Sequence, residues 1–159
     1  MRTNAELYEQ DFYAWTQVQA ALLRKGAVDA LDLSNLAEEV HDLGVSQYTA
    51  VSSDLYQVLL HLLQWQYPPT LCQESPSWRD SIVEQRDRID RICTRMPSLP
   101  PQLPAMLADE YPRARRRARY QTGLPLETFP LTCPWTLDQV LNPDFWPGES
   151  QESHPTDMR

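Results

Sequence analysis

The sequence has little glycine, almost no lysine and no paired cysteine motif. Four of its 159 residues are glycine and fourteen are proline, which favours helices separated by proline-marked breaks. Cys72, Cys93 and Cys133 are odd in number and widely spaced, and none of them forms a Cys-x-x-Cys pair. This spacing argues against a disulfide framework and against a zinc knuckle. We therefore expect free, partly buried thiols.

Long apolar runs are also missing. No run approaches the about 20 residues that a membrane helix requires, and the first residues lack the apolar stretch of a signal peptide. We therefore expect a cytoplasmic protein. The chain has no glycine-rich phosphate loop, no Gly-x-Ser-x-Gly elbow and no His-Glu-x-x-His motif. These common enzyme signatures are thus absent from the sequence, and we expect no cofactor and no metal.

The composition is that of a globular chain. Apolar residues make up 42% and charged residues 23% of the sequence, both near the average for folded domains. A chain of this length is able to bury a core of its own. We expect one helical domain over residues 1–147 and a disordered acidic tail over residues 148–159.

Charge is distributed unevenly along the chain. The net charge is −8, yet residues 77–119 carry ten basic and six acidic side chains, whereas residues 1–45 carry three basic and eight acidic ones. Thirteen of the fourteen basic residues are arginine, which favours planar pairing with carboxylates. We expect the basic and acidic segments to attract one another within the fold or between subunits.

Apolar side chains at spacings of three and four predict four main helices. The first is expected to end at Gly26, the second to begin near Asp32 and stop before Pro68, the third to begin at Pro76, and the fourth to end by Gly123. The predicted fold class is all-α, an antiparallel bundle of about four main helices.

Two features of these helices stay open. The second helix is either continuous or broken at Gly44, and Pro112 either bends the fourth helix or begins it afresh. Beyond the fourth helix, residues 124–147 are rich in proline and tryptophan, and we expect them to pack across the bundle as extended chain. One short helix is expected after Thr136, with Gln139 at the reciprocal position of a capping box.

Histidines provide the candidates for acid-base or metal chemistry. Glu38 and His41 form a Glu-x-x-His pair, the spacing found in di-iron bundles, but such a site needs a second pair and further glutamates. His61 shares a polar stripe with Asp54, Gln57 and Gln64 on a leucine-rich helix. No neighbouring nucleophile is evident. A half-buried histidine, hydrogen-bonded to a neighbouring element, explains His61 better than catalysis does.

An arginine cluster is the most concentrated charge. It comprises Arg113, Arg115, Arg116, Arg117 and Arg119, between two tyrosines. Such a cluster is a candidate site for an anionic ligand or a nucleic acid. The acidity of the whole chain and the scarcity of lysine argue against nucleic acid, so we favour pairing of these arginines with the acidic N-terminal or C-terminal segments.

Four stretches, in their order and spacing, resemble a bacterial family known as domain of unknown function 29, abundant in cyanobacteria. They are LDLSNLAEEVHDLG, HLLQWQYPP, SWRDSIVEQRDRI and TGLPLETFPLTCPWTLDQVL. The resemblance covers roughly residues 8–147 and implies an all-helical bacterial protein without an established activity. The positions that match the family are Glu38, Glu39, His61, Trp65, Gln66, Trp78, Arg86, Pro134 and Trp135.

Four of these matching positions form a candidate polar site. They are Glu38, Glu39, His61 and Arg86, and Arg86 among the tryptophans is a possible partner for either glutamate across a helix interface.

The leading functional hypothesis is a protein-interaction or oligomerisation module, with an unknown partner or a second copy and no membrane. Its alternatives are a metal-dependent or acid-base enzyme using Glu38, Glu39, His41 or His61, and a binder of anions or nucleic acid through Arg113 to Arg119.

Overall fold

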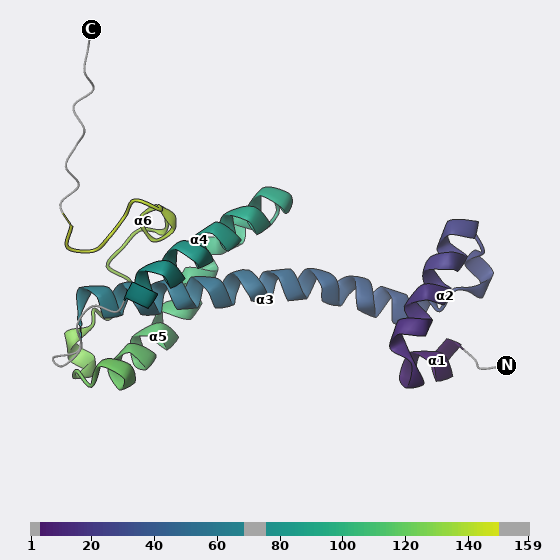
Figure 1. Ribbon diagram of the computed structural model, residues 1–159, viewed down its shortest axis with the longest axis horizontal. Coiled ribbons are helices and arrows are strands. Elements are labelled where there is room, and N and C mark those ends of the chain that lie inside the picture. The colour runs from purple at the N-terminus through teal and green to yellow at the C-terminus, as the bar shows by residue number, and fades with distance from the viewer. Residues whose placement is uncertain (1–3, 69–75, 150–159) are drawn as a thin grey trace, which may run out of the picture. The chain divides into compact units, whose positions relative to one another are not determined.

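The computed structural model describes residues 4–68 and 76–149, and all regular structure in these residues is helical (Figure 1). The all-α class predicted from the sequence is therefore confirmed. The chain divides into two compact units, Met1–Ser46 and Gln47–Arg159, which we call the N-terminal unit and the C-terminal unit. No helix within the described residues has the length and apolar character needed to cross a membrane.

Two helices precede the long helix of the chain. They are α1, Asn4–Gln10, and α2, Phe12–Lys25, and they occupy a region that the sequence predicted as one helix. The break lies at Asp11, whose carboxylate accepts a hydrogen bond from the amide of Ala14 and so caps α2. The predicted end at Gly26 is confirmed, because this glycine adopts the left-handed conformation with φ 68°.

The long helix α3, Leu33–Gln66, is continuous through Gly44. The alternative of a break at this glycine is therefore wrong. One glycine costs a helix only about 1 kcal/mol relative to alanine, which is too little to break a helix of 34 residues. Asp32 caps the start of α3, since its carboxylate accepts from the amide of Asn35 at 3.4 Å and from its side-chain nitrogen at 2.8 Å.

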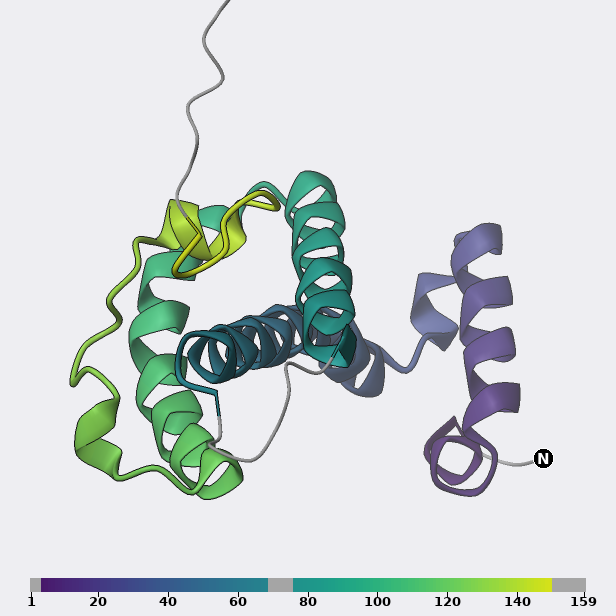
Figure 2. The same cartoon turned by 60° about the vertical axis from the view of Figure 1, so that its left-hand side comes forward.

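The C-terminal unit is built on the second half of α3. Helix α4, Pro76–Arg95, and helix α5, Leu103–Thr122, lie on either side of it, as Figure 2 shows. The side chains between them form one apolar core. Its members include Val51, Leu55, Val58, Leu59, Leu62, Leu63, Ile82, Ile89, Met106, Ala114, Ala118 and Phe129.

Helix α5 contains Pro112 in its interior and continues past it. The proposal that a new helix starts at this proline is therefore wrong. Gly123 ends α5 in the left-handed conformation with φ 73°, which confirms the predicted stop.

The segment after α5 adds aromatic side chains to the core. Phe129 is fully buried, and Trp135 and Trp146 are nearly so. The short helix predicted after Thr136 is present as α6, Leu137–Leu141, with the expected capping box. Of the predicted tail over 148–159, residues 150–159 lie outside the described residues.

Cys93 and Cys133 are free and half-buried, as predicted. Burial raises the pKa of both thiols above the ordinary value, which keeps them protonated. Cys72 lies outside the described residues.

Candidate functional site

An apolar groove of about 350 Å³ lies on the N-terminal unit, between α2 and the first turns of α3. Both helices contribute side chains at spacings of three and four, so each presents one apolar face to the groove. The lining residues are Phe12, Trp15, Thr16, Gln19, Ala20 and Leu23 from α2, and Leu36, Glu39, Val40 and Leu43 from α3.

The floor of the groove is fixed by hydrogen bonds to Asp32. The indole nitrogen of Trp15 donates to the Asp32 carboxylate at 3.2 Å, and the side-chain oxygen of Gln19 accepts from the Asp32 amide at 2.9 Å. Trp15 and Gln19 are each only 1% exposed. The indole nitrogen of Trp15 and the side-chain oxygen of Gln19 are thus bonded to Asp32, just before α3. The surface that these two residues present to the groove is therefore mainly apolar.

Aromatic rings join α1 to this framework. Tyr8 packs edge-on against Trp15 with the ring centroids 4.9 Å apart, and Phe12 stacks on Trp15 at 5.6 Å. The Tyr8 hydroxyl donates to the Glu39 carboxylate at 2.6 Å. This hydrogen bond, together with burial and the negative charges nearby, raises the pKa of Tyr8 to about 12. The hydroxyl therefore stays protonated and keeps Glu39 at the edge of the groove.

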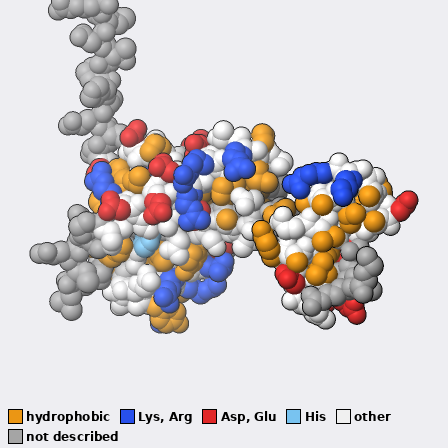
Figure 3. Space-filling model, turned by 45° about the vertical axis from the view of Figure 1, so that its right-hand side comes forward, with side chains coloured by type: hydrophobic (Ala, Val, Ile, Leu, Met, Phe, Trp, Pro, Cys, Tyr) orange, Lys and Arg blue, Asp and Glu red, His pale blue; other side chains and the backbone are white. Residues whose placement is uncertain are grey.

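The rim of the groove is apolar and open. Phe12 is 47% exposed, Leu23 55%, Val40 66% and Leu43 69%. Nine of the thirteen exposed large apolar side chains of the described chain belong to the N-terminal unit: Phe12, Tyr13, Val18, Leu23, Val28, Leu33, Val40, Leu43 and Val45. Figure 3 shows such side chains gathered on the surface of this unit. Apolar side chains concentrated in this way mark a binding surface more often than a solvated one.

The Glu-x-x-His pair is not assembled into a metal centre. Glu38 and His41 are exposed, and Glu39 accepts the hydrogen bond from Tyr8. Across residues 4–68 and 76–149, no three histidine, cysteine or acidic side chains lie close enough together to hold a metal ion. The enzyme hypothesis built on these residues stays a prediction.

His61 belongs to a short chain of hydrogen bonds. Its Nδ1 lies 2.8 Å from the side-chain oxygen of Gln64, whose amide nitrogen donates to the side-chain oxygen of Gln121 on α5 at 2.6 Å. Burial lowers the pKa of His61 below its ordinary value, and the bond to Gln64 only partly opposes this. His61 is thus a half-buried, neutral imidazole that helps to link α3 to α5.

Two buried carboxylates belong to the C-terminal unit. Asp54 pairs with Arg88 at 3.4 Å, and burial nevertheless raises the pKa of its carboxyl group. Glu110 accepts from the Ser52 hydroxyl at 2.7 Å and pairs with Arg113 at 2.6 Å. Both carboxylates connect α3 to a neighbouring helix, which is a structural role.

Arg86 lies inside the C-terminal unit and is 4% exposed. Its Nε donates to the carbonyl oxygen of Val140 and one of its terminal nitrogens to that of Phe145, while its guanidinium lies 5.4 Å from the centre of the Trp146 ring. The sequence placed Arg86 near tryptophans but did not reveal that its partners are backbone carbonyls.

The candidate polar site is divided between the two units. Glu38 and Glu39 belong to the N-terminal unit, whereas His61 and Arg86 belong to the C-terminal unit and bond to other groups there. Neither unit contains a site made of all four residues, and the proposed pairing of Arg86 with a glutamate stays a prediction.

The arginine cluster on α5 is partly used inside the fold. Arg113 pairs with Glu110, and Arg115 donates to the backbone carbonyls of Phe129 and Leu126 at 3.0 Å. The exposed members are Arg113, Arg116, Arg117 and Arg119. Glu110 is a neighbour of Arg113 in the same helix, and Arg115 bonds to carbonyl oxygens. The predicted pairing of the cluster with the acidic N-terminal or C-terminal segments therefore stays a prediction.

The groove was not identified from the sequence. Leu36, Val40 and Leu43 continue the apolar stripe of the buried part of α3, and the spacing alone does not distinguish the two parts. One signal was available in the sequence. The acidic segment 1–45 carries two helices with apolar faces but few further residues that could cover those faces.

Comparison with known proteins places the chain in a family. The model of the family described as Domain of unknown function DUF29 matches residues 7–146. The chain belongs to this family. A search of curated proteins and a search of solved structures each found no match. Membership of DUF29 confirms the resemblance and leaves the activity to be inferred from the groove.

Proposed function

We propose that this DUF29 protein is a protein-interaction module whose N-terminal unit holds an apolar polypeptide segment in the groove between α2 and α3. The observation that carries the proposal is the groove itself, with an apolar rim formed by Phe12, Leu23, Val40 and Leu43 that is about half exposed or more. A binding helix would lay its own apolar face into such a groove.

The geometry of the unit supports binding more than chemistry. The groove contains one titratable group, Glu39, and its carboxylate already accepts a hydrogen bond from Tyr8. The floor residues Trp15 and Gln19 are held by Asp32, so the surface is formed before a partner arrives. A preformed surface reduces the ordering cost of association.

The proposed location is the cytoplasm. The free thiols of Cys93 and Cys133 support it, because reducing compartments keep such groups unpaired.

Site-directed photocrosslinking in the native host tests the proposal. A photoreactive phenylalanine derivative replaces Leu43 on the rim, and the control carries it at Leu131, an apolar residue of the C-terminal unit that is 79% exposed. We expect irradiation to attach a polypeptide at position 43 and none at position 131. Equal labelling at both positions, or no labelling at position 43, would contradict the proposed function.

A further inference from the structure

We propose that the groove is occupied by the N-terminal unit of a second copy of this chain, packed antiparallel about a two-fold axis. This inference rests on the proposed function and names its partner. Three properties of the unit lead to it: an incomplete core, an apolar face suited to a copy of itself, and a separation of charge between α1 and the last turn of α2.

The N-terminal unit does not close a core of its own. Among its described residues only Trp15 and Gln19 are buried, and every described side chain from Val40 to Ser46 is exposed. Sequences of this size bury too small a share of their surface to be stable without a staple or a partner. Two copies placed face to face would each supply the missing layer.

The face has the chemistry that a two-fold interface requires. In such an interface the same patch meets itself, so projecting and recessed parts must both be present and must match in polarity. Here the recess lies over Trp15 and Gln19, and the projecting side chains at its rim include Phe12, Leu23 and Leu43. Apolar rim residues of one copy would enter the apolar groove of the other.

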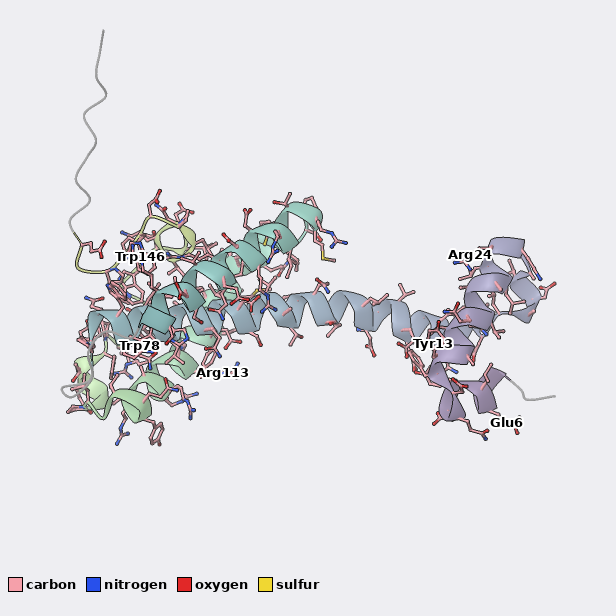
Figure 4. The ribbon with its side chains drawn as sticks, viewed as in Figure 1. Glu6, Tyr13, Arg24, Trp78, Arg113 and Trp146 are labelled. Carbon is pink, nitrogen blue, oxygen red and sulfur yellow. The ribbon has the colours of Figure 1, made fainter. Side chains whose placement is uncertain are left out.

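Charge selects the antiparallel register. Glu6 and Glu9 lie in α1, before the start of α2, and Arg24 and Lys25 lie in the last turn of α2. Figure 4 shows Glu6 and Arg24 near opposite ends of the unit. An antiparallel pair brings the basic last turn of each α2 toward the acidic α1 of the other copy, whereas a parallel pair brings like charges together. Opposite charges across an interface fix its register in this way.

The mass of the purified full-length chain in solution is the first test. We expect light scattering to give twice the monomer mass of 18.4 kDa at high protein concentration. Leu43→Glu places a charge on the rim and should raise the dimer dissociation constant at least about tenfold. Leu131→Glu, at a comparably exposed apolar position of the C-terminal unit, should leave it unchanged.

Charge reversal tests the register. The double variant Arg24→Glu with Lys25→Glu makes both ends of the unit acidic, and Glu6→Arg with Glu9→Arg makes both ends basic. Each variant alone should dimerise more weakly than the original chain. An equimolar mixture should form the heterodimer, because both ends then meet opposite charge. Failure of the mixture to pair, when both variants fold, overturns the antiparallel register.

The outcomes separate this inference from the proposed function. A wild-type chain that stays monomeric at all concentrations, while position 43 crosslinks to a different polypeptide, overturns the second copy and leaves the interaction module standing. A dimer unaffected by Leu43→Glu overturns the placement of the interface in the groove. Absence of any crosslink at position 43 removes the basis of both.

Discussion

The guanidinium of Arg86 donates from its Nε to the carbonyl oxygen of Val140 at 2.8 Å, and this bond connects α4 to α6. A second bond to the carbonyl of Phe145 at 3.1 Å extends the tie beyond α6. Two backbone acceptors that would otherwise be buried without a partner are satisfied by one side chain, while burial lowers the pKa of Arg86 to about 10. Arg86 therefore holds the segment after α5 against α4.

Replacing Arg86 should make the segment after α5 less stably packed. We expect Arg86→Met to lower the free energy of unfolding by about 2 kcal/mol, because two buried carbonyls lose charge-assisted hydrogen bonds. Hydrogen exchange in residues 140–146 should accelerate. Arg91→Met, at an exposed position of the same helix, is the control and should change neither quantity. An unchanged exchange rate in Arg86→Met would show that the two bonds do not hold the segment.

Two glycines should respond oppositely to alanine. Apart from the adjoining backbone, a Cβ at either Gly44 or Gly123 would meet no heavy atom within 4 Å, so the two sites differ in backbone conformation alone. Gly44 is helical, and Gly44→Ala should raise the free energy of unfolding by about 0.5 to 1 kcal/mol. Gly123 has φ 73°, and Gly123→Ala should lower it by about 1 kcal/mol. Urea denaturation of both variants checks the pair, and shifts of the same sign would contradict the argument.

His61 should make the protein less stable in mild acid. Its pKa is lowered in the folded state, so as the pH falls below the unfolded value of 6.5 the unfolded chain takes up a proton that the folded chain resists. The free energy of unfolding should therefore fall until the pH passes the lowered pKa. Urea denaturation at several pH values measures this slope. His61→Gln should reduce the slope, and the exposed His41→Gln should preserve it.

Protonation of Asp54 should stabilise the folded chain in acid, which is the opposite of the effect of His61. Burial raises the pKa of its carboxyl group above 3.8, so this group favours folding fully below pH 3.8 and loses that contribution as the pH rises through the raised value. Asp54→Asn should therefore match or exceed the stability of the original chain at pH 7. The partly exposed Arg88 lowers this pKa, so Arg88→Gln should destabilise the chain at pH 7 but not in strong acid. A loss of stability in Asp54→Asn at pH 7 that persists in acid would point to packing instead of charge.

Helix positions were readable from the sequence because their signals are local. The stop at Gly26, the capping box at Thr136 and Gln139, and the stop at Gly123 each depend on residues within one or two turns. The break at Asp11 was missed, although the residue is a good helix cap, because aromatic spacing continues across it. At this position the apolar spacing favours one continuous helix, whereas the capping residue favours a new helix start. The structure has the new start.

Contacts between distant residues were not readable. Arg86 is 4% exposed and donates to the carbonyl oxygens of residues more than fifty positions away in the sequence. Arg88 forms an ion pair with Asp54, which lies on α3 and is also distant in the sequence. Helical spacing defines the faces of a helix but does not say which face is buried.

The sequence by itself determined the helical class, most helix ends and membership of the DUF29 family, because caps, prolines and family motifs act through neighbouring residues. Only the tertiary structure decided which parts of the apolar stripe on α3 are covered. Val51 and Leu55 are buried in the core of the C-terminal unit, whereas Val40 and Leu43 continue the same stripe and stay exposed on the N-terminal unit. Burial depends on what packs against a face, and the spacing of residues within the face carries no information about that.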